Sequence, residues 1–422
     1  MLTVIIHFFC HCVKYNYVIK YAPHDNFRFT EVFYIKRLID FVRPYVKTFF
    51  QRADIFLFFM CIGCSLFGTV MIYYAVSGMA AAGALDGPLK FVVVQLFSMV
   101  LGIGAFVLLT VIDADILGEQ WKLLLALSGL LLVALAVFGV DDGTGNKAWI
   151  RFFGIGIQPS EFIKIFYIIV SAKQMTYLKE RKDINAFTSL VQMAMLFGVV
   201  FVGIMGVSSD LGSCFVIMLI FLAMMFSAGV KLYWFAAGGA VVAAMVPLIW
   251  TYFLKDYQKK RLVAPYDPSV DPSGYGITWQ TNQSRLTLAS GRFLGVEEGH
   301  RSTVFTGKHT DFIFSAVGEE LGMVGCILVL TLLVILIIHC AKVGIHAGRT
   351  FDMLICMGVA ASLFFQMLIN IGMCIGITPV IGITLPFFSY GGSSMMAMFA
   401  AMGLVSGVKF KPKPQLFSVM YN

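Results

Sequence analysis

The chain has 422 residues, of which 59% are apolar and 13% are charged, well below the ~25% charged share of soluble globular domains. Its mean hydropathy is +0.86. This composition excludes a disordered chain, an ordinary cytosolic enzyme and a nucleic-acid-binding domain, so no nucleic-acid partner is expected. It predicts an integral membrane protein, and the net charge of +8 should then lie mainly on the cytoplasmic side.

Residues 1–53 are predicted to form a cytoplasmic N-terminal tail. Within residues 31–52, apolar side chains recur at helical spacing with basic side chains among them. The apolar positions are Val32, Ile35, Ile39, Val42, Val46 and Phe49, and the basic ones are Lys36, Arg37, Arg43 and Lys47. This pattern predicts an interfacial amphipathic helix on an anionic leaflet, with a disordered basic tail as the alternative.

Long stretches without charged residues mark the predicted membrane spans, since a spanning helix needs about 20 apolar residues. These stretches are 55–85, 91–112, 123–140, 187–209, 211–230, 232–254 and 321–341. The run 353–408 is too long for one span and is interrupted by Pro379 and Pro386, so it predicts two. One further span, about 157–178, carries charged residues.

The resulting fold class is an all-α integral membrane protein, because open strands leave backbone groups unpaired in lipid. Residues 54–409 are predicted to contain ten membrane helices, the eighth starting near Phe312, with a large loop, 255–311, between helices 7 and 8. Basic residues gather in the tail 1–53, in alternate loops and in a C-terminal tail, 410–422. The positive-inside rule therefore predicts that both termini of this multi-pass protein are cytoplasmic.

The loop 255–311 is basic although it is predicted to lie outside, which suggests an anionic ligand. Its basic residues include Lys260, Arg261 and Arg285. Two Asp-Pro pairs place Asp267 and Asp271 after the first two of these, and turn formation alone would explain both pairs. A carboxylate among cations also suits transfer from a pyrophosphate donor: the carboxylate acts as general base, and the cations stabilise the leaving group.

An aspartate is a weak base at its usual pKa of about 3.9. Partial burial would raise the pKa of such a base, whereas neighbouring cations would lower it. Polar residues elsewhere in the loop complete the set expected to contact a pyrophosphate. They are Gln283, Ser284, His309 and Asp311.

Polar groups inside the predicted spans are the other candidates, because they are costly in a membrane. Glu161 and Lys164 are three residues apart near the start of helix 4, which allows a structural ion pair or a charged cavity wall. Asp210 precedes helix 6 and suits helix capping. Two further groups were singled out as cavity or packing elements: the adjacent acids Glu319 and Glu320, which point to different faces, and the small-residue run containing Ser389, Gly391 and Gly392.

Six motifs occur in the order seen in the SEDS family (shape, elongation, division and sporulation), which this sequence resembles over about residues 54–409. They are QPSEFIK, SDLGS, DPSVDPSGYG, HTDFIF, GEELG and LPFFSYGGSS. The resemblance implies a ten-helix bacterial plasma-membrane protein with peptidoglycan glycosyltransferase activity on lipid II. By motif position it implies that Asp271 is the catalytic base, supported by the pair Glu161 and Lys164.

The resemblance also implies a class B penicillin-binding protein as partner, together with other proteins of the elongation or division complex. The segment after Asp271 is longer than the family pattern, so Asp267 stays an alternative base. A lipid II flippase and a non-catalytic scaffold are the alternative functions. The sequence has no metal-ligand spacing, although Mg²⁺ or Mn²⁺ on the pyrophosphate is chemically compatible. The motifs do not choose between elongation, division and sporulation.

Overall fold

The computed structural model describes residues 49, 53–81, 87–140, 147–152, 155–296, 305 and 307–409. The chain divides into two units, residues 1–51 and 52–422, and the fold below is that of the second. The predicted C-terminal tail 410–422 lies outside the described residues, and so does the predicted interfacial helix in residues 31–52, apart from residue 49.

Eight helices in the described part of the chain are long and apolar enough to cross a membrane. Their bounds are α3 (Ile55–Ala81), α4 (Pro88–Val111), α6 (Trp121–Phe138), α8 (Phe187–Ser208), α9 (Leu211–Ala228), α10 (Leu232–Leu248), α13 (Ile313–Ile345) and α14 (Thr350–Ile375). The protein is therefore an all-α membrane protein in its main architecture, as the composition predicts. A short helix, α5 (Ala114–Glu119), joins α4 to α6.

Two further long helices lie among these eight. They are α7 (Pro159–Arg181) and α15 (Gly392–Lys409). Most of α15 is buried, and most of the side chains of α7 between Pro159 and Ala172 are buried as well. Both helices therefore belong to the core of the bundle, and the two buried charged residues of α7, Glu161 and Lys164, form an ion pair.

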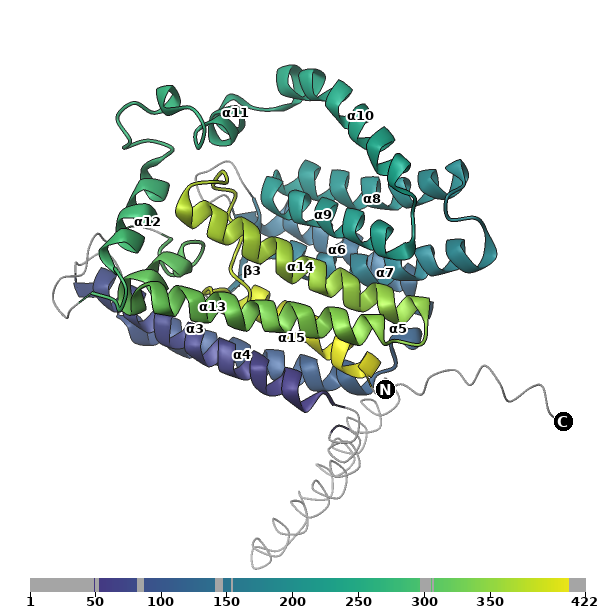
Figure 1. Cartoon of the computed structure of the whole chain (residues 1–422), viewed down its shortest axis with the longest axis horizontal. Coiled ribbons are helices and arrows are strands. Elements are labelled where there is room, and N and C mark those ends of the chain that lie inside the picture. Colours follow the sequence, from purple (N-terminus) through teal and green to yellow (C-terminus); the bar gives the residue numbers. More distant parts are fainter. Residues whose placement is uncertain are drawn as a thin grey trace, which may run out of the picture. The chain divides into compact units, whose positions relative to one another are not determined.

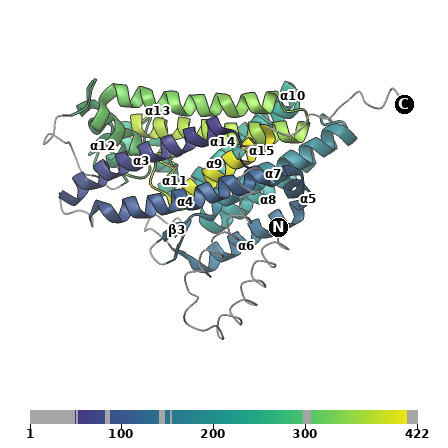
Figure 2. The same cartoon turned by 90° about the horizontal axis from the view of Figure 1, so that it is seen from below.

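Helix α15 lies between α4 on one side and α13 and α14 on the other (Figure 2). Its contact with α4 is close because small residues meet aromatic rings: a Cβ at Gly102 of α4 would lie 2.9 Å from the ring of Phe399, and one at Gly403 would lie 2.6 Å from the carbonyl oxygen of Phe106. Helix α14 packs against α13, α9 and α7 (Figure 1). These contacts place α14 and α15 at the centre of the bundle.

One end of the bundle is fastened by a buried carboxylate. Asp54, which precedes α3, accepts hydrogen bonds from its own helix at Leu57 and from Lys409 of α15, and it contacts His339 of α13. Its backbone N–H donates to Ser406 of α15. This cluster joins the start of α3 to α13 and to the last turns of α15.

A small antiparallel sheet links α6 to α7. This sheet is not predicted from the sequence. Its strands are β1 (Gly139–Val140), β2 (Trp149–Phe152) and β3 (Ile155–Ile157), in the order β1-β2-β3. Gly139 pairs with Ile150, which pairs with Ile157 on its other side. These residues fall at the ends of the predicted spans, where the short apolar strands are hard to separate from helix by hydropathy alone.

Helix α10 stands apart from the bundle. None of its described residues is buried, and Figure 1 shows it leaving the side of α9 and running away from α14. Pro247 lies inside it, and its last turns become a π-helix, η2 (Ile249–Phe253). Proline removes one helical hydrogen bond, and the change of helix type begins two residues after it.

The segment between η2 and α13 contains short helices that arch over one end of the bundle (Figure 1). They are α11 (Asp256–Val263), the 3₁₀ turn η3 (Pro268–Val270) and α12 (Trp279–Ser290). This segment corresponds to most of the predicted loop 255–311, which therefore contains three short helices.

Helix α13 is broken at Gly322, where φ is 63°. The freed N–H groups of Met323 and Val324 donate to the backbone carbonyls of Arg292 and Phe293. A Cβ at Gly322 would lie 2.4 Å from the carbonyl carbon of Phe293, so only glycine allows both the backbone angle and this close approach. The break ties the end of the α12 segment to the middle of a membrane helix.

Candidate functional site

Four hydrogen bonds hold the Asp271 carboxylate in the segment between α11 and α12. Its Oδ2 accepts hydrogen bonds from Gly276 N (2.9 Å), Thr278 N (3.1 Å) and Thr278 Oγ1 (2.7 Å), and its Oδ1 accepts one from Ser273 Oγ (2.9 Å). The backbone folds back over five to seven residues to make these contacts, with Gly274 at φ 69°. The turn therefore fixes the carboxylate by four donors and leaves Oδ1 the less occupied oxygen.

The hydrogen bonds from Thr278 lower the pKa of Asp271 to about 2. Neither burial nor nearby cations, the two effects considered from the sequence, therefore dominates this pKa. Hydrogen bonds donated to the ionised carboxylate do. Asp267 also has a lowered pKa, because its carboxylate accepts from Ser269 N at 2.9 Å and caps η3. Both candidates are ionised at neutral pH, so ionisation does not distinguish them.

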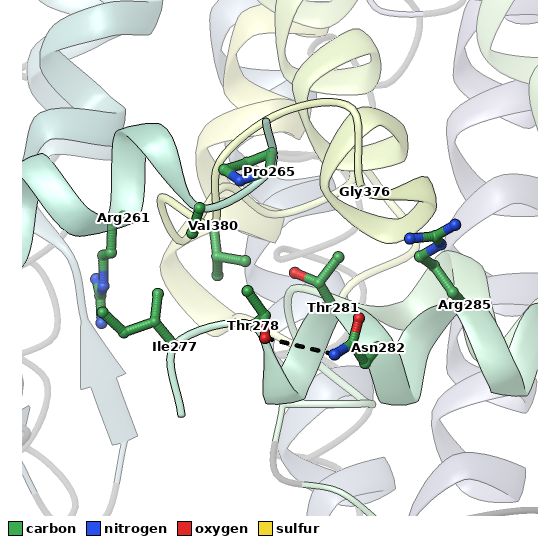
Figure 3. A pocket seen from close by; sticks show the side chains of 10 residues that line it. Arg261, Pro265, Ile277, Thr278, Thr281, Asn282, Arg285, Gly376 and Val380 are labelled. Atoms are coloured by element: carbon green, nitrogen blue, oxygen red, sulfur yellow. Dashed lines mark hydrogen bonds between the residues drawn. The ribbon is translucent and has the colours of Figure 1, made fainter. Parts of the chain in front are cut away.

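A pocket of about 60 Å³ lies beside the Asp271 turn, between α11, α12 and the segment after α14 (Figure 3). Thr278, which holds Asp271, lines it together with Thr281 and Asn282 of α12. Arg261 and Arg285 also line it and lie on opposite sides of the pocket in Figure 3. Arg261 and Arg285, both among the predicted cations, therefore line the same pocket as Thr278, which donates a hydrogen bond to Asp271.

A second, smaller hollow adjoins the first. It is lined by Ser209, Gly212 and Arg261, with Val380 shared between the two hollows. Arg261 therefore lies between the Asp271 turn and the start of α9, where Asp210 caps the helix. This contact between distant motifs could not be predicted from the sequence.

The other residues predicted for the loop lie in different surroundings. Lys260 is exposed and does not line either hollow. Ser284 is fully buried and donates to the carbonyl of Cys374 at 2.9 Å, so its hydroxyl docks α12 on α14 and is not free for a pyrophosphate. Gln283 has a buried Oε1 without a hydrogen-bond partner among the described residues.

Asp210 is the centre of a buried polar cluster that joins three helices. Its Oδ2 accepts from Gln158 Nε2 (3.1 Å) and Ser213 Oγ (2.7 Å), and its Oδ1 accepts from Ser213 N (3.0 Å). Ser213 Oγ also lies 2.9 Å from Ser160 Oγ, and Gln158 N donates to Ser393 of α15. The expected helix cap is present, and it also connects the starts of α7, α9 and α15.

The turn before α13 and the small-residue run before α15 are joined by backbone contacts. Ser389 Oγ donates to the carbonyl of Thr310 at 2.6 Å and accepts from Leu385 N. Gln95 of α4 donates to the carbonyl of Ser389 and accepts from Gly391 N. The run containing Ser389 and Gly391 therefore packs against α4 and the turn before α13, and Gly392 begins α15.

His309 and Asp311 lie in this same turn but do not form a cationic site. The His309 ring packs against Phe91 and Tyr390 with centroid separations of 5.1 and 5.6 Å, and burial lowers its pKa to about 4, so it is neutral. Burial, followed by the negative charge of Asp210, raises the pKa of Asp311 to about 6. His309 therefore brings no positive charge to this turn, and its predicted contact with a pyrophosphate stays a prediction.

The pair Glu161 and Lys164 is buried near the start of α7. Lys164 Nζ donates to Glu161 Oε1 at 2.9 Å, and both side chains are at most 5% exposed. Glu161 Oε2 has no hydrogen-bond partner among the described residues. The predicted ion pair is therefore present, and one of its oxygens is still available to a ligand or to water.

A second buried ion pair joins Lys308 to Glu319. Lys308 is one of the basic residues of the predicted loop 255–311, but its side chain is only 6% exposed. Glu320 is partly accessible, in agreement with the expectation that two adjacent acids point to different faces. Three residues that hold the site together, Thr278, Gln95 and Lys308, were thus missed, because their partners are distant in the chain or lack a recognisable motif.

Comparison with known proteins gives a consistent family assignment. The model of the FtsW, RodA and SpoVE family, described as "Cell cycle protein", matches residues 54–413. The chain is 32% identical over 368 residues to the probable peptidoglycan glycosyltransferase FtsW of Trichlorobacter lovleyi, covering 85% of this chain and 94% of that protein. It is 33% identical over 287 residues to the peptidoglycan glycosyltransferase MrdB of Escherichia coli K12, covering 66% and 75%.

Solved structures agree with this similarity. A chain from a peptidoglycan synthase complex that coordinates polymerization and crosslinking matches with a TM-score of 0.70 and 29% identity, over 85% of this chain and 97% of that one. The rod shape determining protein RodA of Thermus thermophilus matches with a TM-score of 0.61 over 85% and 98%, and at 24% identity it supports the fold.

Proposed function

Because the chain belongs to the FtsW, RodA and SpoVE family, we propose that it polymerises lipid II into glycan strands at the Asp271 turn. It is a peptidoglycan glycosyltransferase, the activity for which its relatives are named. One observation supports this assignment of the site most directly. Thr278 lines the arginine-lined pocket and donates a hydrogen bond to Asp271.

The reaction needs a base, an electrophile and a stabilised leaving group. Asp271 takes the proton of the acceptor sugar's 4-hydroxyl through Oδ1, which accepts only from Ser273 among the described residues. The resulting oxygen attacks the anomeric carbon of the donor and inverts it, and the bond from that carbon to the pyrophosphate breaks. Arg261 and Arg285 stabilise the charge that develops on the departing undecaprenyl pyrophosphate.

Asp267 is the weaker candidate for the base. Its carboxylate caps η3 through Ser269, and it lines neither of the two hollows. Asp271 is joined through Thr278 to the arginine-lined pocket, so a donor pyrophosphate there would bring its anomeric carbon near Asp271. This difference favours Asp271.

Residues beyond the arginine pocket have supporting places in the proposal. Glu161 and Lys164 form a charged wall within the bundle, and Glu161 Oε2 offers an acceptor to the substrate. A Mg²⁺ or Mn²⁺ ion would take most of its ligands from the pyrophosphate and water, since no group of three His, Cys, Asp or Glu in the described residues is placed to hold a metal.

The membrane arrangement completes the proposal. Helices α7 and α15 cross the membrane with the eight apolar helices, giving ten spans, and the α11–α12 segment lies on the outer side between spans 7 and 8. Both termini are then cytoplasmic, as the distribution of basic residues indicates. A class B penicillin-binding protein is the proposed partner, supported by the similar chain in a synthase complex that couples polymerization to crosslinking, with other elongation or division proteins alongside.

The test is polymerisation of purified lipid II by the full chain with its cognate partner, comparing Asp271→Asn with Asp267→Asn. Both substitutions keep the size of the side chain, and equal thermal stability of the two variants controls for folding. We expect Asp271→Asn to abolish glycan synthesis and Asp267→Asn to retain most of it. The reverse result would move the base to Asp267. Flipping of lipid II without polymerisation by the wild type would instead support the flippase alternative.

A further inference from the structure

A hollow of about 400 Å³ lies between α6, α7 and α8, away from both hollows beside the arginines. Almost all of its lining is aliphatic. The lining residues are Leu125, Ser128, Gly129 and Leu132 of α6, Ile163 and Gln174 of α7, and Gln192, Met195, Leu196, Val199 and Val200 of α8. A Cβ at Gly129 would meet nothing within 4 Å, so the hollow reaches the backbone of α6.

The hollow is polar at one end only. Helices α6 and α8 begin, and α7 ends, on the same side of the bundle, so Leu125, Gln174 and Gln192 lie toward that side and Leu132 and Ile163 lie deeper. Gln174 Nε2 donates to the carbonyl of Gln192 at 2.9 Å. Its Oε1 is buried and has no partner among the described residues, which leaves an acceptor at the polar end unused.

Cations lie beyond this polar end. Lys122 precedes Leu125 by three residues and Arg181 follows Gln174 by seven, so each lies on the helix face that lines the hollow. Both side chains are exposed. The hollow is therefore aliphatic in the middle of the bundle. Toward the basic end of the bundle, the amides of Gln174 and Gln192 come next, followed by the cations Lys122 and Arg181.

We propose that this hollow binds an anionic phospholipid, with one acyl chain between α6, α7 and α8, the glycerol region at Gln174 and Gln192, and the phosphate headgroup at Lys122 and Arg181. The apolar, polar and cationic parts of the hollow match, in the same order, the acyl chain, the ester region and the anionic headgroup of such a lipid. Basic residues at the ends of membrane helices are typical binding sites for anionic headgroups. An ordered water at the ester level supplies the donor that Gln174 Oε1 lacks.

The isoprenoid chain of an undecaprenyl substrate is the competing occupant, and its chemistry fits less well. Such a chain has no polar group to place at the amide pair. Its pyrophosphate belongs near Arg261 and Arg285, next to the start of α9, whereas Gln174 lies toward the end of α7. Arg261 also lines the hollow beside Gly212, at the outer end of the helices by this topology.

The bound lipid would support the buried charge pair of the site. Ile163 of α7 lines the hollow and lies between Glu161 and Lys164 in the sequence. A chain filling the hollow packs α6 and α8 against this helix and replaces contacts that an empty space would forfeit. Binding therefore stabilises the helix that carries the pair.

The test is native mass spectrometry of the delipidated full-length protein, titrated with dioleoyl phosphatidylglycerol or with dioleoyl phosphatidylcholine, which carry the same chains. We expect phosphatidylglycerol to bind roughly thirtyfold more tightly, from two cations near the headgroup. Gly129→Leu, which fills the open space, should lose this binding. The double variant Lys122→Gln, Arg181→Gln should bind both lipids equally.

Gly104→Leu is the matched control, because a Cβ at Gly104 of α4 also meets nothing within 4 Å but lies outside the hollow. It should bind phosphatidylglycerol as the wild type does. Equal binding by wild type and Gly129→Leu would overturn the proposal. So would displacement of phosphatidylglycerol by undecaprenyl phosphate in the wild type but not in Lys122→Gln, Arg181→Gln, which would assign the hollow to the isoprenoid.

Discussion

Replacing Asp311 by asparagine should stabilise the protein at neutral pH. The Asp311 carboxyl lies in the turn before α13, and burial together with the charge of Asp210 raises its pKa to about 6, from 3.8. No group among the described residues donates a hydrogen bond to this carboxylate, whereas the Asp311 backbone carbonyl accepts from Asn370 at 2.7 Å. Asp311→Asn therefore removes an unfavourable charge and leaves the backbone contact in place.

The magnitude follows from the difference between the two pKa values. Each pKa unit corresponds to about 1.36 kcal/mol, so a rise of roughly two units costs about 3 kcal/mol once the group is ionised. Between pH 3.8 and about 6 the folded state binds more protons than the unfolded state, so the free energy of unfolding falls as pH rises through this range. The cost is absent at pH 4 or below and complete above pH 7.

Thermal unfolding of the purified protein in detergent, followed by tryptophan fluorescence at pH 4 and pH 7.5, measures the effect. We expect Asp311→Asn to unfold at a higher temperature than the wild type at pH 7.5 and at nearly the same temperature at pH 4. Asp267→Asn is the control, because the pKa of Asp267 is lowered and its loss should not stabilise. An equal gain for Asp311→Asn at both pH values would refute the argument.

Three other substitutions test separate parts of the structure. Lys164→Met should cost about 3–5 kcal/mol by leaving the buried carboxylate of Glu161 unpaired, and adding Glu161→Gln should recover most of it, as measured by thermal unfolding. Thr278→Val should lower the rate of lipid II polymerisation several-fold by removing a 2.7 Å hydrogen bond to Asp271, the proposed base, whereas Thr278→Ser should keep it. Equal rates for Thr278→Val and the wild type would contradict this role. Gly322→Ala should destabilise the protein by at least about 2 kcal/mol because of its positive φ and the adjacent backbone, whereas Gly104→Ala, in a helix with open space, should be neutral or stabilising in the same assay.

Hydropathy predicted the membrane helices well because lipid imposes one requirement over a whole span. The predicted run 187–209 and the helix Phe187–Ser208 agree closely. The sheet β1-β2-β3 was missed, since its strands are two to four residues long and merge with the apolar spans on either side. The break at Gly322 was also missed, because the groups that compensate it belong to Arg292 and Phe293.

The site was predictable where one short segment carries the chemistry. The cap at Asp210 and the local pair Glu161 and Lys164 followed from position and spacing, whereas the role of Asp271 stays a prediction. The assembly of these groups was not predictable, because it depends on contacts between segments far apart in the chain. Thr278 illustrates this: it has no motif of its own, but it joins the Asp271 turn to the pocket.

The cluster around Asp210 has an evolutionary consequence. One carboxylate satisfies Gln158 and Ser213, and the same cluster reaches Ser160 and Ser393, so a substitution on any one helix strands polar atoms on others. Such positions are expected to change together or remain fixed in descendants. That coupling explains why separate short motifs, each common by chance, would be inherited as a set.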